Sequence, residues 1–123
     1  MPLLLSRITC GSGMKIGFAQ INPTVGDLTG NFEKIAGAYE RLAAAGAELV
    51  VTPELAITGY PPQDLVFKSQ FVPQNLEVLQ QLQDRVGSAA LLVGYVERND
   101  GRGKPFHNAA ASVAVPNTAD CRR

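Results

Sequence analysis

Apolar residues recur along the chain in two periods, one typical of strands and one typical of helices. Short apolar runs rich in β-branched and aromatic residues predict strands at 14–22, 47–54, 89–97 and 106–115. Apolar steps of three and four residues predict two helices. The first has its apolar face at Phe32, Ile35, Ala36, Tyr39, Leu42 and Ala43, and the second, over 75–87, at Leu76, Leu79, Leu82 and Val86.

Signals at the ends of these segments indicate how they are connected. Asn31 is a typical N-cap for the first helix, and Gly46 and Gly87 are typical C-terminal stops. Pro62 favours a short helical turn, and the turn RNDGRGKP indicates that the last two strands form an antiparallel hairpin. The resulting order, β-α-β-α-β-β, predicts an α/β fold built in layers.

The ends of the chain lie outside this pattern. Residues 1–13 contain an apolar patch that is too short for a signal peptide. We therefore expect a disordered leader there, with Met14 as an alternative natural start. Residues 14–115 are expected to form one partial domain, and residues 116–123 an unpatterned tail.

The composition limits the size and the partners of the protein. With 123 residues, 46% of them hydrophobic, the chain is long enough for one core and too short for two. Its 11 basic residues balance 11 acidic ones, which argues against a nucleic-acid or membrane partner. Cys10 and Cys121 suggest neither a disulfide framework nor a metal site, so a cytoplasmic setting is expected. No apolar run is long enough to span a membrane.

The stretch TPELAITGYPPQDL, residues 52–65, places a carboxylate where the pattern predicts the end of a buried strand. The two valines before it are typical of a strand covered on both faces, and Pro53 ends regular pairing. Glu54 therefore follows the carboxyl end of a strand, where ligands bind in α/β folds. It is either a solvated turn carboxylate or a catalytic carboxylate held in a pocket, and the pattern alone favours the first.

Four segments resemble the amino-terminal half of the nitrilase, or carbon–nitrogen hydrolase, superfamily: MKIGFAQINPTVGDLTGNFEKI, GAELVVTPELAITGYPPQDL, LLVGYVER and HNAAASV. They occur in the order and spacing of that family over residues 14–113. The extension GYPPQDL is most similar to the glutaminase domain of glutamine-dependent NAD synthetases. The resemblance implies an α-β-β-α sandwich, of which this chain supplies the amino-terminal half.

The resemblance also implies a chemistry, in which a Glu-Lys-Cys triad releases ammonia from glutamine. A separate synthetase domain then uses ATP and magnesium to amidate nicotinic acid adenine dinucleotide. By resemblance, Glu54 is the general base, and no residue of this chain is assigned to a cofactor or a metal. A carboxylate in water is a weak base toward a thiol at neutral pH, so the site also needs dry surroundings and a neighbouring cation. The intact enzyme is expected to be a homo-oligomer.

After HNAAASV the chain departs from the family pattern. The family continues with a catalytic lysine and a strand-to-helix elbow that carries the cysteine, whereas this chain continues with AVPNTADCRR. Lys104 precedes the last strand and Cys121 follows no strand, so neither matches the pattern. The sequence therefore predicts a truncated fragment that is inactive alone. It also predicts marginal stability, because half of a sandwich exposes apolar sheet surface.

Two other functions stay open at this point. One is another amidohydrolase of the same superfamily that acts on a small amide, against which GYPPQDL argues. The other is a non-catalytic fragment that pairs with a related subunit through an open sheet edge. Structural roles are expected for Tyr60, in packing, and for Asn108, in capping or bridging backbone near the site. His107 is expected on the surface of a strand.

Overall fold

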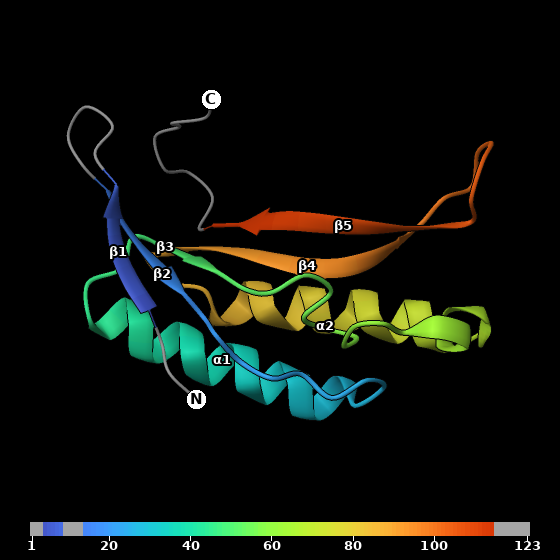
Figure 1. Ribbon diagram of the computed structural model, residues 1–123, viewed down its shortest axis with the longest axis horizontal. Helices are drawn as coiled ribbons and strands as arrows, with labels where there is room; N and C mark the ends of the chain where they lie inside the picture. Colours follow the sequence, from blue (N-terminus) through green and yellow to red (C-terminus); the bar gives the residue numbers. More distant parts are fainter. Residues whose placement is uncertain (1–3, 9–13, 115–123) are drawn as a thin grey trace.

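The computed structural model describes residues 4–8 and 14–114, which form one five-stranded sheet with two long helices against one of its faces (Figure 1). The strands are β1 (Leu4–Ile8), β2 (Met14–Phe18), β3 (Leu49–Val51), β4 (Ala90–Arg98) and β5 (Phe106–Val113). The helices are α1 (Leu28–Ala44), the 3-10 helix η1 (Gln63–Phe67) and α2 (Phe71–Arg85). Within the described residues, none of these helices combines the length and the apolarity that a membrane crossing requires.

The sheet is parallel at its centre and antiparallel at its edges. β2, β3 and β4 run parallel, because α1 and α2 each return the chain to the same end of the sheet. β1 pairs antiparallel with β2, and β5 pairs antiparallel with β4. The last pair runs from Leu91 opposite Val113 to Arg98 opposite Phe106. This is the hairpin that the sequence predicts.

The leader contains the first difference from the sequence prediction. Leu4–Ile8 is not disordered but forms β1, with Leu4 opposite Phe18 and Ile8 opposite Met14. Without β1, the outer N–H and C=O groups of β2 would form an open sheet edge, and pairing with β1 satisfies them. The rest of the predicted leader and the predicted tail, with both cysteines, lie outside the described residues.

Both long helices begin earlier than the sequence predicts. The N-cap of α1 is Asp27, whose carboxylate accepts a hydrogen bond from the N–H of Gly30 at 3.0 Å. Asn31 is fully buried in the first turn, so its assignment as the cap is wrong. α2 begins at Phe71 rather than at residue 75, because Pro73 lies in the first turn, where a missing N–H costs no helical hydrogen bond.

The helices seal one face of the sheet. The side chains between the layers are almost fully buried, and they include Ile35, Leu42, Val50, Leu82, Leu91 and Val93. Gly17 allows α1 to approach closely, because a Cβ atom there would lie 3.0 Å from a methyl group of Leu42. The guanidinium of Arg85 joins α2 to α1 through a 2.8 Å salt bridge with Glu40.

The opposite face of the sheet has no helix over it among the described residues (Figure 1). Successive residues of a strand point to opposite faces, so the neighbours of the buried Val50 point away from the helices. These neighbours, Leu49 and Val51, are only half-buried, as are Phe18 on β2 and Leu92 on β4. The prediction that this strand is covered on both faces is therefore wrong for the described residues. We call this surface the open face.

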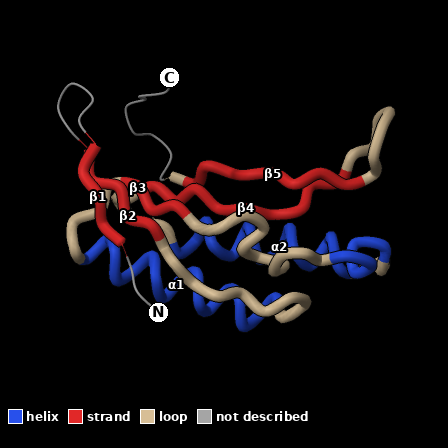
Figure 2. The backbone as a smooth tube through the Cα atoms, in the orientation of Figure 1, coloured by secondary structure: helices blue, strands red, loops and turns tan. Residues whose placement is uncertain are grey.

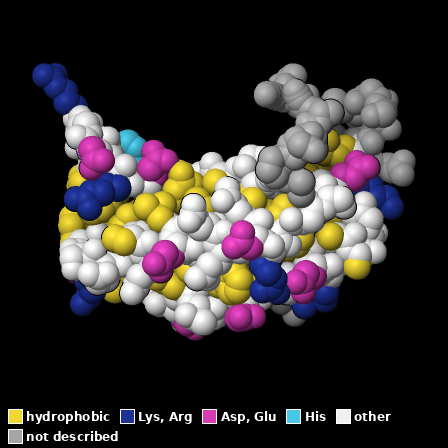
Figure 3. Space-filling view, turned by 180° about the vertical axis from the view of Figure 1, so that it is seen from behind, with side chains coloured by type: hydrophobic (Ala, Val, Ile, Leu, Met, Phe, Trp, Pro, Cys, Tyr) yellow, Lys and Arg dark blue, Asp and Glu magenta, His cyan; other side chains and the backbone are white. Residues whose placement is uncertain are grey.

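Charged side chains do not form a large patch of one sign on the side of the molecule that Figure 3 shows. Acidic and basic groups alternate over the surface there, as expected from equal numbers of each.

Candidate active site

β4 extends well beyond the end of β3, and there the loop after β3 becomes the neighbour of β4 (Figure 2). The backbone N–H of Thr52 donates to the carbonyl of Leu92 at 3.0 Å. The Thr52 hydroxyl accepts from the N–H of Gly94 at 3.2 Å, and the Gly94 carbonyl accepts from the N–H of Ile57 at 3.2 Å. The loop is therefore tied to β4 at both ends of the stretch that contains Glu54.

Gly94 allows this stretch to bulge over the sheet. A Cβ atom on Gly94 would lie 2.5 Å from the backbone nitrogen of Leu55 and 3.0 Å from the carbonyl oxygen of Pro53. The neighbouring Val93 is fully buried against the helices, so Gly94 points to the other face. The bulge, and Glu54 with it, consequently lies on the open face.

Asn31 holds the other end of the loop. Its Nδ2 donates to the carbonyl of Ile57 at 2.9 Å and to the carbonyl of Thr24 at 2.8 Å. Its Oδ1 accepts from the N–H of Thr24 at 2.8 Å. A buried amide with all of these partners is costly to remove, because each lost bond leaves a polar group unsatisfied. Asn31 thus joins α1, the loop before it and the loop after β3.

The backbone turns sharply directly after Glu54. Leu55 has a φ of 48°, in the left-handed region that side chains other than glycine adopt rarely. The Leu55 side chain is only 4% exposed, and Ala56 and Ile57 are fully buried. Their burial holds the turn in place while the Glu54 side chain remains exposed. The predicted position of Glu54, just past the carboxyl end of a strand, is confirmed because β3 ends at Val51.

Asn108 on β5 is the described hydrogen-bond partner of the Glu54 carboxylate. Its Nδ2 donates to Glu54 Oε2. In the hairpin Asn108 lies opposite Val96, two residues from the pair formed by Ala110 and Gly94, and so it shares the face of Gly94. The interpretation of Asn108 as a cap or bridge for backbone is wrong, because its amide contacts a side chain that the sequence separates from it by 54 positions.

The other residues singled out in the sequence lie apart from this pair. Tyr60 is 62% exposed and makes no buried packing contact of the kind predicted. His107 is exposed, as predicted, and points to the opposite face of β5 from Asn108. Lys104 lies in the exposed hairpin loop. Among the described residues, the salt bridges are Arg85–Glu40 and Arg98–Asp100, so they supply no cation for Glu54.

A hollow with several apolar walls lies at the carboxyl ends of β2 and β3. It is lined by Phe18, Ala19, Gln20, Val51, Thr52 and Pro53. Pro53 directly precedes Glu54 in the chain, so the backbone of Glu54 begins where the wall of this hollow ends. An apolar hollow beside one fixed polar group is typical of a small-molecule site.

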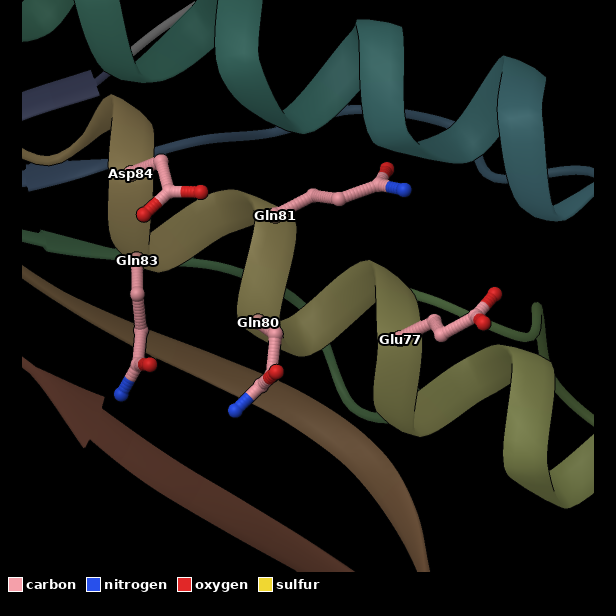
Figure 4. Close-up of a pocket in the computed structure, with 5 residues that line it drawn as sticks. All are labelled: Glu77, Gln80, Gln81, Gln83 and Asp84. Atoms are coloured by element: carbon pink, nitrogen blue, oxygen red, sulfur yellow. The ribbon is translucent and has the colours of Figure 1, made fainter.

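A second hollow, on α2, has a different character. Its walls are Glu77, Gln80, Gln81, Gln83 and Asp84, and Figure 4 shows their side chains spreading from one helix without meeting at a point. Such an arrangement has no apolar wall and no convergent groups. No cluster of metal-binding side chains occurs in the part of the chain that the structure describes.

Two ionisable groups in other parts of the structure have raised pKa values. The pKa of the Tyr95 hydroxyl is raised, chiefly by its hydrogen bond to Glu97 and further by burial. The pKa of the exposed Arg85 is raised by its hydrogen bond and charge interaction with Glu40. These groups stabilise local structure and do not contribute to the hollow beside Glu54.

The model of the carbon–nitrogen hydrolase family matches residues 15–120, most of the chain. The chain belongs to this family. Among curated relatives, a glutamine-dependent NAD(+) synthetase from Synechocystis is 49% identical over 82 residues, which are 66% of this chain and 15% of the relative. The corresponding protein from Thermotoga maritima is 33% identical over 102 residues, or 81% of this chain and 17% of the relative.

Solved structures of carbon–nitrogen hydrolases agree with the fold. A glutamine-dependent NAD+ synthetase from Acinetobacter baumannii superposes with a TM-score of 0.74 at 25% identity, over 82% of this chain and 19% of that chain. An amidase from Nesterenkonia superposes with a TM-score of 0.60 at 27% identity, over 68% of this chain and 32% of that chain. The predicted α/β fold of the nitrilase type is confirmed, and this chain represents one part of it.

Proposed function

We propose that this chain is the amino-terminal part of a glutamine-hydrolysing domain, and that Glu54 is its general base. The supporting observation is the position of Glu54, exposed on the open face beside an apolar hollow and hydrogen-bonded by Asn108. The curated relatives of this chain are named glutamine-dependent NAD(+) synthetases. Because the chain spans 15% and 17% of these two relatives, the activity is proposed for the longer protein to which such a segment belongs.

In the proposed reaction Glu54 accepts and returns one proton in each of two steps. The carboxylate takes the proton of a cysteine thiol, and the thiolate attacks the amide carbon of glutamine. Glu54 returns the proton to the leaving nitrogen, so that ammonia departs and a thioester remains. Glu54 then takes a proton from water, the hydroxide attacks the thioester, and glutamate leaves while the thiol is reprotonated. A lysine ammonium stabilises the oxyanion in both steps.

The described residues supply one member of this triad, Glu54. The lysine and the cysteine are assigned to the family elements that follow HNAAASV. Those elements would pack against the open face, which is uncovered among the described residues. ATP and magnesium are assigned to a synthetase domain, and homo-oligomerisation to the intact enzyme. A reduced thiol fits a cytoplasmic setting.

The comparisons favour this function over that of a simple amidase. The superposition with the NAD+ synthetase has a TM-score of 0.74, against 0.60 for the amidase, and the curated relatives reported above are named glutamine-dependent NAD(+) synthetases. Ammonia transfer to a synthetase domain is therefore preferred over release of ammonia as the final product.

A chimera tests the proposal in a complete enzyme. Residues 14–113 replace the matching segment of the Synechocystis relative, and NAD formation is measured with glutamine or with ammonium chloride as the nitrogen source. Ammonium bypasses the glutaminase step, so the rate with ammonium reports folding and synthetase activity independently of glutamine hydrolysis. We expect the chimera to use both nitrogen sources. In the Glu54→Gln chimera, the rate of NAD formation from glutamine should fall at least about 1,000-fold, as for removal of a central catalytic group, while the rate with ammonium should not change.

Two outcomes would contradict the proposal. One is a chimera that uses ammonium at the parent rate but cannot use glutamine. The other is a Glu54→Gln chimera that still forms NAD from glutamine. As a separate check, the isolated chain is expected to release no ammonia from glutamine, because its described residues carry one triad member.

A further inference from the structure

We propose that Asn108 is a positioning residue for the base, which it holds through a hydrogen bond from Nδ2 to Glu54 Oε2. The inference rests on the proposed role of Glu54. It assigns to the β5 strand a part in the reaction that is separate from the three residues of the triad.

The backbone alone cannot aim the carboxylate. The ties to β4 and to Asn31 hold the backbone on either side of Glu54, but the exposed side chain keeps several rotatable bonds. Among the described residues, its hydrogen bond with Asn108 is the only side-chain interaction recorded for Glu54. A general base has to be aimed within a fraction of an ångström, so this single contact selects the orientation.

Asn108 is itself held on a rigid support. It lies opposite Val96 in the β4–β5 ladder. The backbone of Val96 is bonded on its other side by the buried Asn75 of α2, whose Nδ2 donates to the Val96 carbonyl at 2.8 Å and whose Oδ1 accepts from the Val96 N–H at 3.1 Å. Asn75 of α2 therefore fixes β4 at the residue opposite Asn108, and the pairing of β5 with β4 sets the position of Asn108.

The chemistry of an amide suits this position. An amide N–H donates to a carboxylate without adding a charge, whereas a lysine would form an ion pair and an aspartate would repel it. Nδ2 of Asn108 bonds Oε2 of Glu54, and no described residue bonds Oε1. We therefore assign the thiol proton to Oε1. The N–H of Asn108 can remain on Oε2 in both protonation states, so the side chain need not move during the proton transfers.

The test uses the same chimera with Asn108→Ala and Asn108→Asp, and Asn99→Ala as a control on the same hairpin. Asn99 bonds only to the loop around it, through the carbonyls of Arg102 and Lys104 and the N–H of Gly101. We expect Asn108→Ala to lower kcat/KM for glutamine between about tenfold and a hundredfold, mainly through kcat. Ammonium-supported synthesis should stay within about twofold of the parent, as should both activities of Asn99→Ala.

The pH profile separates positioning from a structural role. In Asn108→Asp two carboxylates compete for one proton, so the acidic limb of glutamine-supported activity should move to higher pH by about one unit or more. The pH at which the acidic limb falls does not depend on how much active protein is present. It can therefore be measured on the active fraction even where a variant folds poorly. A merely structural Asn108 would lower both activities and leave the limb unmoved.

The outcomes distinguish this inference from the proposed function. If Glu54→Gln abolishes glutamine use while Asn108→Ala and Asn108→Asp keep the parent kcat/KM and pH profile, the positioning role is wrong and the base assignment stands. If Glu54→Gln retains glutamine use, both proposals are wrong.

Discussion

The two faces of the sheet differ in what their side chains do, although the same strands supply both. On the helix-covered face, Val50, Leu91 and Val93 are fully buried. On the open face, the adjacent Leu49, Val51 and Leu92 are half-buried. The alternation of a strand thus places the core of the fold on one side and an unsealed apolar surface on the other.

Polar groups differ between the faces in the same way. Asn31 and Asn75 are fully buried on the helix side of the molecule, and each bonds two or more backbone groups. Glu54 and Asn108 are exposed on the open face and bond each other. The buried amides fix backbone, and the exposed pair contains the proposed base. The core of the fold and the proposed site therefore lie on opposite sides of one layer.

The largest predicted effect comes from truncating neighbouring leucines on the two faces. We expect Leu91→Ala, on the covered face, to lower the free energy of unfolding by about 3 kcal/mol. Leu92→Ala, on the open face, should cost about 1 kcal/mol, because part of its surface already contacts water. Urea unfolding followed by circular dichroism measures both, and equal losses would contradict the contrast between the faces.

The next effect concerns the buried amides. Asn31→Ala removes the bonds to Thr24 and Ile57 and leaves their backbone groups unsatisfied, so the free energy of unfolding should fall by about 2 kcal/mol. The exposed Asn22 is the matched control, and Asn22→Ala should stay within about 0.5 kcal/mol of the parent. Similar unfolding midpoints for the two variants in urea would show that the Asn31 bonds add nothing.

The smallest effect is a pH dependence at Tyr95. Its pKa is raised in the folded chain, chiefly by the hydrogen bond to Glu97, so the folded state retains the proton to higher pH than the unfolded state. The stabilisation is fully present below about pH 10, the unfolded value, and is lost as the pH rises through the folded value. When the pH is raised from about 9 to about 11, a range that includes the pKa of tyrosine in the unfolded state, the urea midpoint of Tyr95→Phe should therefore fall less than that of the parent. An unchanged fall would count against this bond.

Local sequence signals predicted those parts of the fold that depend on neighbouring residues. The hairpin, the two long helices and the strand end before Glu54 follow from turn residues and apolar spacing. The sequence predicts Asn31 as a cap because asparagine near a helix start is typical of one, yet its partner Ile57 lies 26 positions away. β1 was missed because an edge strand of five residues carries little periodicity of its own.

The site could be predicted only in part for the same reason. The sequence points to Glu54 because its motif resembles that of a known family, whereas the position of Asn108 at the start of a strand suggests only a structural role. The contact between them joins segments 54 positions apart, and it depends on the Gly94 bulge. The useful signal was the glycine within an apolar strand, which indicates close approach of another backbone segment.

The most direct test of the account is the ratio of glutamine-supported to ammonium-supported NAD formation in the chimera, with Glu54→Gln compared with Glu77→Gln. Glu77 is an exposed glutamate on α2, away from the open face. The account predicts that Glu54→Gln lowers this ratio at least about 1,000-fold and that Glu77→Gln leaves it at the parent value. Equal ratios in the two variants would contradict the assignment of Glu54 as the base.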